Sequence, residues 1–88
     1  MQVQVEKKTD DQLIAIGVFS WPVWHKEVSE FEWSYDEQER CYILEGEAEV
    51  IADGAVYRFE KGDFVTFPVG MNCEWKVTKP IRKHYQMG

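Results

Sequence analysis

Apolar and polar residues alternate over short stretches along most of the chain, which is the pattern of strands with one buried face. The clearest example is the run in which Cys73, Trp75 and Val77 alternate with polar residues. Turn residues separate such stretches every eight to twelve positions, as in small all-β barrels and sandwiches. The predicted strands cover residues 2–6, 24–35, 40–44, 47–50, 55–59, 64–67, 73–77 and 82–86. Residues 24–35 form either two short strands or one strand bent near its middle.

One segment near the N-terminus departs from this alternation. Residues 9–12, Thr-Asp-Asp-Gln, have the form of a capping box ahead of an apolar run, and Gly17 is the predicted end of the helix. The pattern predicts one or two helical turns, which we expect to lie across a mouth of the barrel. Further along, Asp53-Gly54 predicts a tight hairpin between two strands.

Two stretches between residues 39 and 70 carry Glu, Gly and Pro residues at characteristic spacings. Glu39 and Gly46 stand in the first stretch, and Gly62, Pro68 and Gly70 stand in the second. These residues resemble the two sequence motifs of the cupin family, whose members fold as jelly-roll β-barrels. The resemblance implies an all-β, RmlC-like cupin barrel with one short N-terminal helix, spanning residues 1–88 as a single domain.

The chain departs from the family's metal-binding pattern at three positions. Trp33 and Tyr35 stand where the first motif has histidines, and Cys73 stands where the second motif has one. Only Glu39 is retained among the four usual ligands, so we expect no metal or other cofactor. The alternative is a divalent metal, best suited to zinc, held by Glu39, Cys73 and His84.

Two further runs resemble a particular branch of the family. The run WPVWHKEVSEFEW and the ending IRKHY are similar to very small single-domain cupins related to the domain of ureidoglycine aminohydrolase. The resemblance implies an enzyme that hydrolyses a ureido amine at a metal held by histidines and a glutamate. Because Trp33 and Tyr35 replace two of those histidines, that activity is not expected here.

Strand periodicity together with the motif match predicts which side chains face the barrel interior. A carboxylate there costs several kcal/mol unless it is paired or protonated. Glu39 therefore requires Tyr35, a nearby Arg or Lys, or a ligand's donor group as its partner. Alternatively, the aromatic rings simply fill the space that a metal centre would need. The predicted interior residues are Trp33, Tyr35, Glu39, Cys41, Cys73 and Trp75.

These residues favour one function and leave two alternatives. The favoured function is binding of a small molecule in an aromatic-lined barrel cavity, with Glu39 as its polar anchor. The first alternative is a metal-dependent hydrolase or isomerase that uses Glu39 and Cys73. The second is a non-catalytic structural or interaction module with a packed interior.

Composition limits the class of partner. A formal net charge of −6 disfavours nucleic acid and anionic membranes as partners, since both select basic faces. The late cluster of basic residues is expected to form one solvated strand face, and Glu45, Glu47 and Glu49 a solvated or subunit-facing edge. The basic residues of the cluster are Lys76, Lys79, Arg82 and Lys83.

The ends of the chain bear on location and assembly. Neither end has the form of a signal peptide, and no apolar run reaches membrane-spanning length, so we expect a cytoplasmic protein with free thiols. Val3 and Val5 lie in a terminal strand that is able to pair with a neighbour. Because cyclic pairs are the commonest homo-oligomers, we expect a homodimer.

Overall fold

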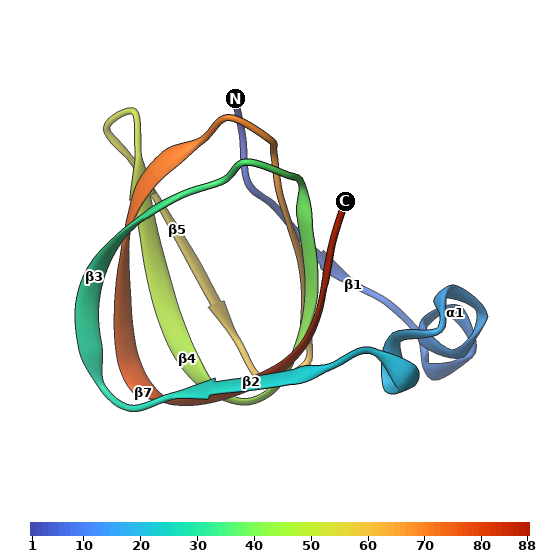
Figure 1. Ribbon diagram of the computed structural model, residues 1–88. Coiled ribbons are helices and arrows are strands. Elements are labelled where there is room, and N and C mark those ends of the chain that lie inside the picture. Colours follow the sequence, from blue (N-terminus) through green and yellow to red (C-terminus); the bar gives the residue numbers. More distant parts are fainter.

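The computed structural model describes residues 1–88 and consists of one antiparallel sheet rolled into a barrel (Figure 1). Neighbouring strands pair in the order β1-β6-β4-β7-β2, while β3 also pairs with β7 and β5 with β4. The predicted all-β architecture is confirmed. The strands are β1 (Gln4–Lys7), β2 (Val23–Lys26), β3 (Ser29–Ser34), β4 (Glu39–Ala52), β5 (Ala55–Glu60), β6 (Asp63–Phe67) and β7 (Asn72–Met87). The helices are α1 (Asp10–Ile16) and the 3-10 helix η1 (Val18–Ser20).

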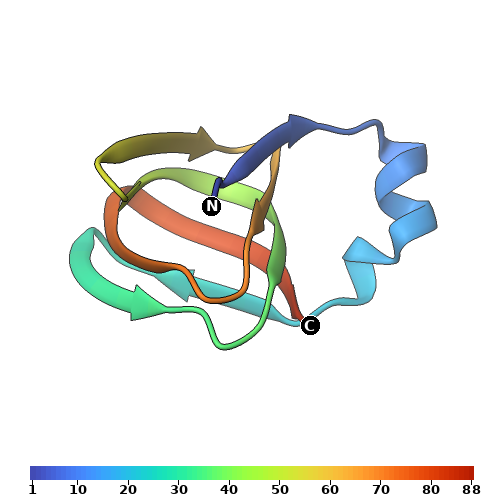
Figure 2. The same ribbon diagram turned by 90° about the horizontal axis from the view of Figure 1, so that it is seen from above.

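Two long strands, β4 and β7, form the frame of the barrel and pair with each other along most of their length (Figure 2). The sequence pattern predicted each of them as two separate strands, which is wrong. The register shifts around Gly46, where the backbone has a φ of 88°. A Cβ atom there would lie 2.1 Å from the Pro80 carbonyl oxygen. Glycine therefore lets the two strands bend together without ending.

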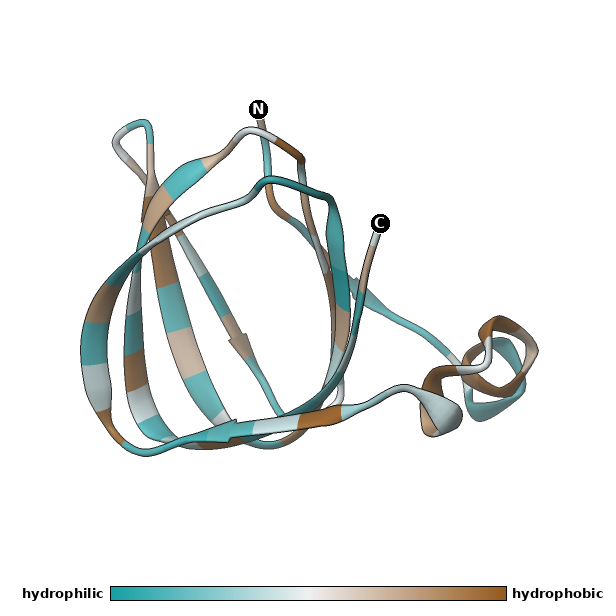
Figure 3. Ribbon diagram, in the orientation of Figure 1, coloured by the Kyte–Doolittle hydropathy of each residue, from teal (hydrophilic) through white to brown (hydrophobic).

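The main core lies inside the barrel, and side chains along its strands alternate between buried and more exposed positions as the sequence predicted. Cys73, Trp75 and Val77 are buried on β7, while their neighbours on the same strand are more exposed. Ala48 and Val50 are buried in the same way on β4. Bands of hydrophobic and hydrophilic residues along the strands show this alternation (Figure 3).

The predicted N-terminal helix is present, with the predicted capping. The Thr9 hydroxyl accepts a hydrogen bond from the Gln12 backbone N–H, and Gln12 Oε1 accepts one from the Thr9 N–H. Gly17 ends the helix with a φ of 87°. We expected the helix to lie across a mouth of the barrel, and this expectation is wrong. The helix lies at the side of the barrel (Figures 1 and 2). Leu13 instead joins a small second core with Phe64, on the outer face of β6.

The remaining turns settle the open questions about strand boundaries. Residues 24–35 form two strands, because β2 ends at Lys26 and β3 begins at Ser29, and both pair with β7. The predicted hairpin joins β4 to β5, with positive φ at both Asp53 and Gly54. None of the helices has the length and apolar character that crossing a bilayer requires.

Candidate functional site

The interior of the barrel holds a cavity of about 240 Å³ whose wall is mostly aromatic. Its lining residues come from β2, from β3 and the residue that follows it, from the start of β4 and from both halves of β7. Only two of its nine lining residues are charged, and both lie deep in the barrel. The lining residues are Trp24, Phe31, Trp33, Tyr35, Glu39, Trp75, Lys83, Tyr85 and Met87.

The polar part of the cavity is a hydrogen-bonded cluster of three side chains. Lys83 Nζ lies 2.7 Å from Glu39 Oε2, and both side chains are almost fully buried, at 5% and 6% exposure. The Tyr35 hydroxyl donates to Glu39 Oε1, also at 2.7 Å. Burial raises the pKa of Tyr35, and the neighbouring Glu39 carboxylate raises it further, so this hydroxyl remains a donor. Each carboxylate oxygen of Glu39 therefore has a partner within the protein.

The Lys83 ammonium also lies against aromatic rings. Its Nζ is 4.6 Å from the ring centroid of Trp75, 4.9 Å from that of Trp24 and 5.9 Å from that of Phe67. Ring faces attract a cation, and more strongly where water is excluded. Lys83 is thus held by one carboxylate and a cage of rings.

Lys83 was placed wrongly by the sequence analysis, which assigned it to a solvated basic face. That assignment gave weight to its basic neighbours and not to its strand position. The two-residue period of β7 is interrupted at Lys79, which is exposed, but it resumes at Ile81 and Lys83, which are both buried like Val77. Arg82, by contrast, lies outside and pairs with a glutamate of β4. The signal was therefore present in the periodicity.

The six predicted interior residues divide into two groups. Tyr35, Glu39 and Trp75 are buried and line the cavity, while Trp33 lines it from the rim with 51% of its surface exposed. Trp33 was expected to face inward. It stands on β3 where the strand nears its end. The other two predicted residues, Cys41 and Cys73, are buried in the core but are not among the residues that line the cavity.

The two cysteines are free thiols with weak acidity. Burial raises the pKa of Cys41 to about 12, an effect that Lys83 opposes and Glu39 reinforces. Burial and the Glu39 charge raise the pKa of Cys73 to about 11. Reactive thiols have lowered pKa values instead, so neither cysteine has the character of an activated nucleophile.

The alternative metal set of Glu39, Cys73 and His84 is not brought together, and no three His, Cys, Asp or Glu residues are placed to hold a metal ion. His84 follows Lys83 on β7 and therefore points to the other side of the sheet. Its Nδ1 lies 2.8 Å from the Trp21 carbonyl oxygen, and its ring meets Phe19 edge-on. Its role is to hold the segment that leads into β2.

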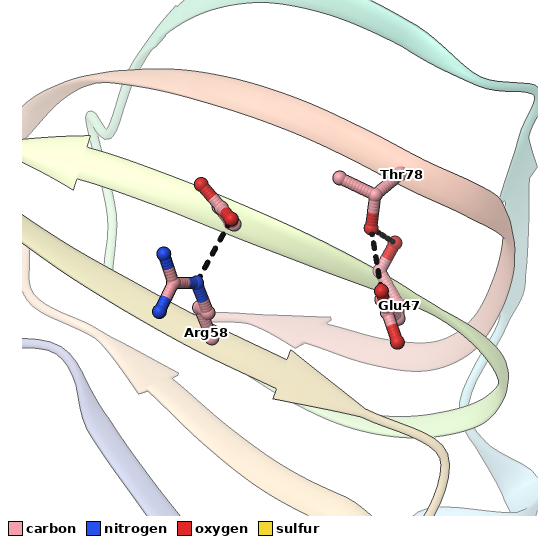
Figure 4. A network of polar contacts seen from close by, with 4 residues as sticks. Glu47, Arg58 and Thr78 are labelled. Carbon is pink, nitrogen blue, oxygen red and sulfur yellow. Dashed lines mark hydrogen bonds and ion pairs between the residues drawn. The ribbon is translucent and has the colours of Figure 1, made fainter.

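The glutamates of β4 that were expected to face outward do so. Glu47 accepts a hydrogen bond from Thr78 of β7, and Glu49 pairs with Arg58 of β5 at 2.9 Å (Figure 4). Glu45 pairs with a basic residue of β7 in the same manner. These are exposed cross-strand pairs, each of which contributes little to stability.

A family model described as the EutQ-like cupin domain matches residues 13–85. The chain belongs to this cupin family. The match begins within α1 and covers the barrel strands from β2 to most of β7, and it confirms the fold that the two sequence motifs implied. No curated protein sequence matches the chain.

Solved structures give the same fold. A DUF861 family protein from Thermotoga maritima is 53% identical, with a TM-score of 0.96, and the match covers 99% of this chain and 100% of that one. The EutQ protein of Clostridium difficile is 22% identical, with a TM-score of 0.69, over 74% of this chain and 52% of that one. A putative ethanolamine utilization protein Q from Salmonella typhimurium is 20% identical, with a TM-score of 0.68, over 99% of this chain and 69% of that one. The last two show the fold alone, and no specific activity follows from these likenesses.

Cupins can bind metals, but the residues of this cavity do not fit a metal centre. Trp33 and Tyr35 occupy positions where the motif has ligands, and neither side chain is a usual ligand. Both oxygens of Glu39 already accept hydrogen bonds from Tyr35 and Lys83. The Lys83 ammonium supplies the positive charge beside this carboxylate and would repel a second cation. That the protein holds no metal remains a prediction.

Proposed function

We propose that this cupin-domain protein binds a small molecule in its barrel cavity. The observation that carries the proposal is the wall itself: seven hydrophobic side chains surround about 240 Å³, and the only charged groups are Glu39 and Lys83. Apolar walls with a few convergent polar groups are the usual form of small-molecule sites. A cavity of about 150 Å³ accommodates benzene, so this one has room for a substituted ring.

The cost of the polar cluster supports the same function. Burying an ion pair requires removing two charges from water, and well-packed apolar residues in its place are often equally stable. The Glu39–Lys83 pair is nevertheless buried, and it borders the cavity. A role in recognising a ligand would account for both facts.

The two alternatives have less support. A hydrolase or isomerase that uses Glu39 and Cys73 would need a reactive thiol or a metal, whereas the raised pKa of Cys73 disfavours the first. Hydrolysis of a ureido amine, as in ureidoglycine aminohydrolase, would need the histidines that Trp33 and Tyr35 replace. An interaction module becomes the better interpretation if the cavity binds nothing.

The experiment is a screen of small ring compounds by tryptophan fluorescence and thermal shift. A compound at one hundred times its dissociation constant stabilises the fold by about 2.7 kcal/mol, which raises Tm by several degrees in a domain of this size. Trp33→Ala should weaken each hit, because Trp33 forms the rim of the cavity. Phe19→Ala is the matched control, since Phe19 is 48% exposed but lies outside the barrel. The proposal is overturned if no compound binds, or if both substitutions weaken the hits equally.

A further inference from the structure

We infer that the ligand of this cavity is an uncharged, flat molecule whose hydrogen-bond acceptor is bound by the ammonium of Lys83. This inference rests on the proposed function and names the chemical class that the site selects. It follows from the charge, the hydrogen-bonding capacity and the shape of the cavity.

The first step concerns charge. Glu39 and Lys83 are the only charged residues in the lining, and they neutralise each other at a distance of 2.7 Å. A ligand carrying a net charge of either sign would enter a space with mostly apolar walls and without a free counter-charge. Removing such a charge from water is costly unless it is paired. The cavity therefore selects against both anions and cations.

The second step concerns hydrogen bonds. An ammonium group has three donors, and Lys83 directs one of them to Glu39. Around the rest of the ammonium are the rings of Trp24 and Trp75, both of which line the cavity. Each oxygen of Glu39 keeps a second lone pair but already accepts one hydrogen bond, whereas two of the three N–H groups of Lys83 have no hydrogen-bond acceptor. A buried donor without an acceptor is the costlier of the two, so the ligand group that suits this site is an acceptor such as a carbonyl oxygen.

The third step concerns shape. The rings of Phe31 and Trp75 are nearly parallel, with an interplanar angle of 6° and centroids 6.0 Å apart. Trp24 meets both of them at 65°. Walls built from ring faces and edges pack best against another flat group, because aromatic pairs favour offset-stacked or edge-to-face contacts. A planar, unsaturated body attached to the acceptor satisfies this geometry.

The test compares four single-ring compounds of similar size by NMR titration. Acetophenone is neutral and has an acceptor, ethylbenzene has no acceptor, benzoate is an anion and benzylamine is a cation at neutral pH. A hydrogen bond to a charged donor corresponds to about tenfold or more in affinity. We expect acetophenone to bind at least about tenfold more tightly than ethylbenzene, and more tightly than either charged compound.

Variants at β7 test the role of Lys83. In Lys83→Met the advantage of acetophenone over ethylbenzene should disappear, while ethylbenzene still binds. Lys76→Met is the control, because Lys76 lies on the same strand but 38% of its side chain is exposed and it pairs with Glu30 outside the barrel. If Lys83→Met does not fold, the double variant Glu39→Gln/Lys83→Met removes the unpaired charge and serves in its place.

The possible outcomes separate this inference from the proposed function. If none of the four compounds binds and the wider screen also fails, the proposed function is overturned. If ring compounds bind but benzoate or benzylamine binds most tightly, or acetophenone shows no advantage over ethylbenzene, the inference is wrong and the proposed function stands. An advantage that persists in Lys83→Met, or one that is lost equally in Lys76→Met, would overturn the assignment of Lys83 as the donor.

Discussion

Lys83 and Glu39 lie 44 positions apart in the sequence, yet Lys83 Nζ and Glu39 Oε2 are 2.7 Å apart inside the barrel. The pair joins the first residue of β4 to the C-terminal part of β7, where the two strands run side by side. It is the only ion pair of the protein in which both side chains are buried. Several properties of the protein should therefore depend on it.

The first prediction is that breaking the pair costs more than removing it. Glu39→Gln or Lys83→Met alone leaves one charged or polar group buried without its partner, and we expect either to lower the free energy of unfolding by about 3–5 kcal/mol. The double variant Glu39→Gln/Lys83→Met should recover most of that loss. Urea unfolding of the four proteins forms a double-mutant cycle that measures the coupling. Losses that simply add would contradict the prediction.

The second prediction concerns the bend shared by β4 and β7. Gly46→Ala should destabilise the fold by about 1–2 kcal/mol for its positive φ, and by about 1–3 kcal/mol more for the contact with Pro80. Gly54→Ala is the matched control: its φ is also positive, at 78°, but no atom lies within 4 Å of the added Cβ. Thermal unfolding should show the larger loss for Gly46→Ala. Equal losses would mean that the close approach to Pro80 is easily relieved.

A third prediction is that the purified protein holds no stoichiometric transition metal. Trp33 and Tyr35 stand at two positions where the cupin motif has metal-binding histidines. Both oxygens of Glu39, the one retained ligand, accept hydrogen bonds from Tyr35 and Lys83. Elemental analysis of untagged protein measures this directly. About one zinc, manganese or iron per chain, lost in Glu39→Gln, would overturn it.

The fourth prediction is a loss of stability at alkaline pH that arises from Cys41. Burial raises its pKa to about 12 in the folded state, from 9.0 as the ordinary value. Above about pH 9 the unfolded chain therefore releases a proton that the folded chain retains. The contribution of Cys41 is fully present below pH 9 and decreases by about 1.4 kcal/mol per pH unit as pH rises toward 12.

Urea unfolding of the protein and of Cys41→Ala between pH 8 and 11 tests this. The substitution itself creates a small cavity and lowers the free energy of unfolding at every pH. The two proteins are therefore compared by the slope of the free energy of unfolding against pH, and not by its absolute value. The slope should be shallower in Cys41→Ala. Parallel curves would show that Cys41 ionises no differently in the folded state.

The fifth prediction concerns assembly, and we propose a homodimer formed through β1. This strand lies at one end of the strand order and pairs only with β6, so its other edge is free to pair with a second copy. Val5 is 40% exposed on this strand, whereas Val3 is buried in the core and does not contribute to the proposed interface. Light scattering should give about twice the chain mass of 10.4 kDa.

Val5→Lys should reduce that mass, while Val56→Lys should not, because Val56 is similarly exposed but lies on β5. The monomer mass for the unsubstituted protein at micromolar concentrations would argue against assembly. A dimer unaffected by Val5→Lys would place the interface elsewhere.

The sequence was a good guide wherever a residue's environment depends on its near neighbours. The capping box at Thr9, the hairpin at Asp53-Gly54 and the buried face of Cys73, Trp75 and Val77 were all predicted, because caps, turns and strand alternation are local. The barrel fold itself was predicted from the resemblance to the two cupin motifs. Lengths of strands were predicted poorly, since Gly46 looks like a stop in the sequence and acts as a bend in the structure.

The candidate site was predicted only in part, because its polar partners meet across the barrel. Tyr35, Glu39 and Trp75 were identified as interior residues, and a Lys or Arg partner for Glu39 was among the options considered. Which basic residue would fill that role depends on the register between β4 and β7, which alternation within one strand does not determine. The exposed position of Trp33 likewise depends on where β3 ends relative to β7.

The pairing of β4 with β7 also has a consequence for how the protein folds. Its register sets Glu39 opposite Met87 and Ile51 opposite Glu74, so the frame of the barrel joins parts of the chain that are distant in sequence. Such contacts stabilise the fold only after large loops have closed, which costs conformational entropy. Proteins dominated by contacts of this kind fold in about milliseconds to seconds. The cavity exists only once both ends of this pairing have formed. Ligand binding can therefore serve as a kinetic probe that reports when the pairing of β4 with β7 is complete.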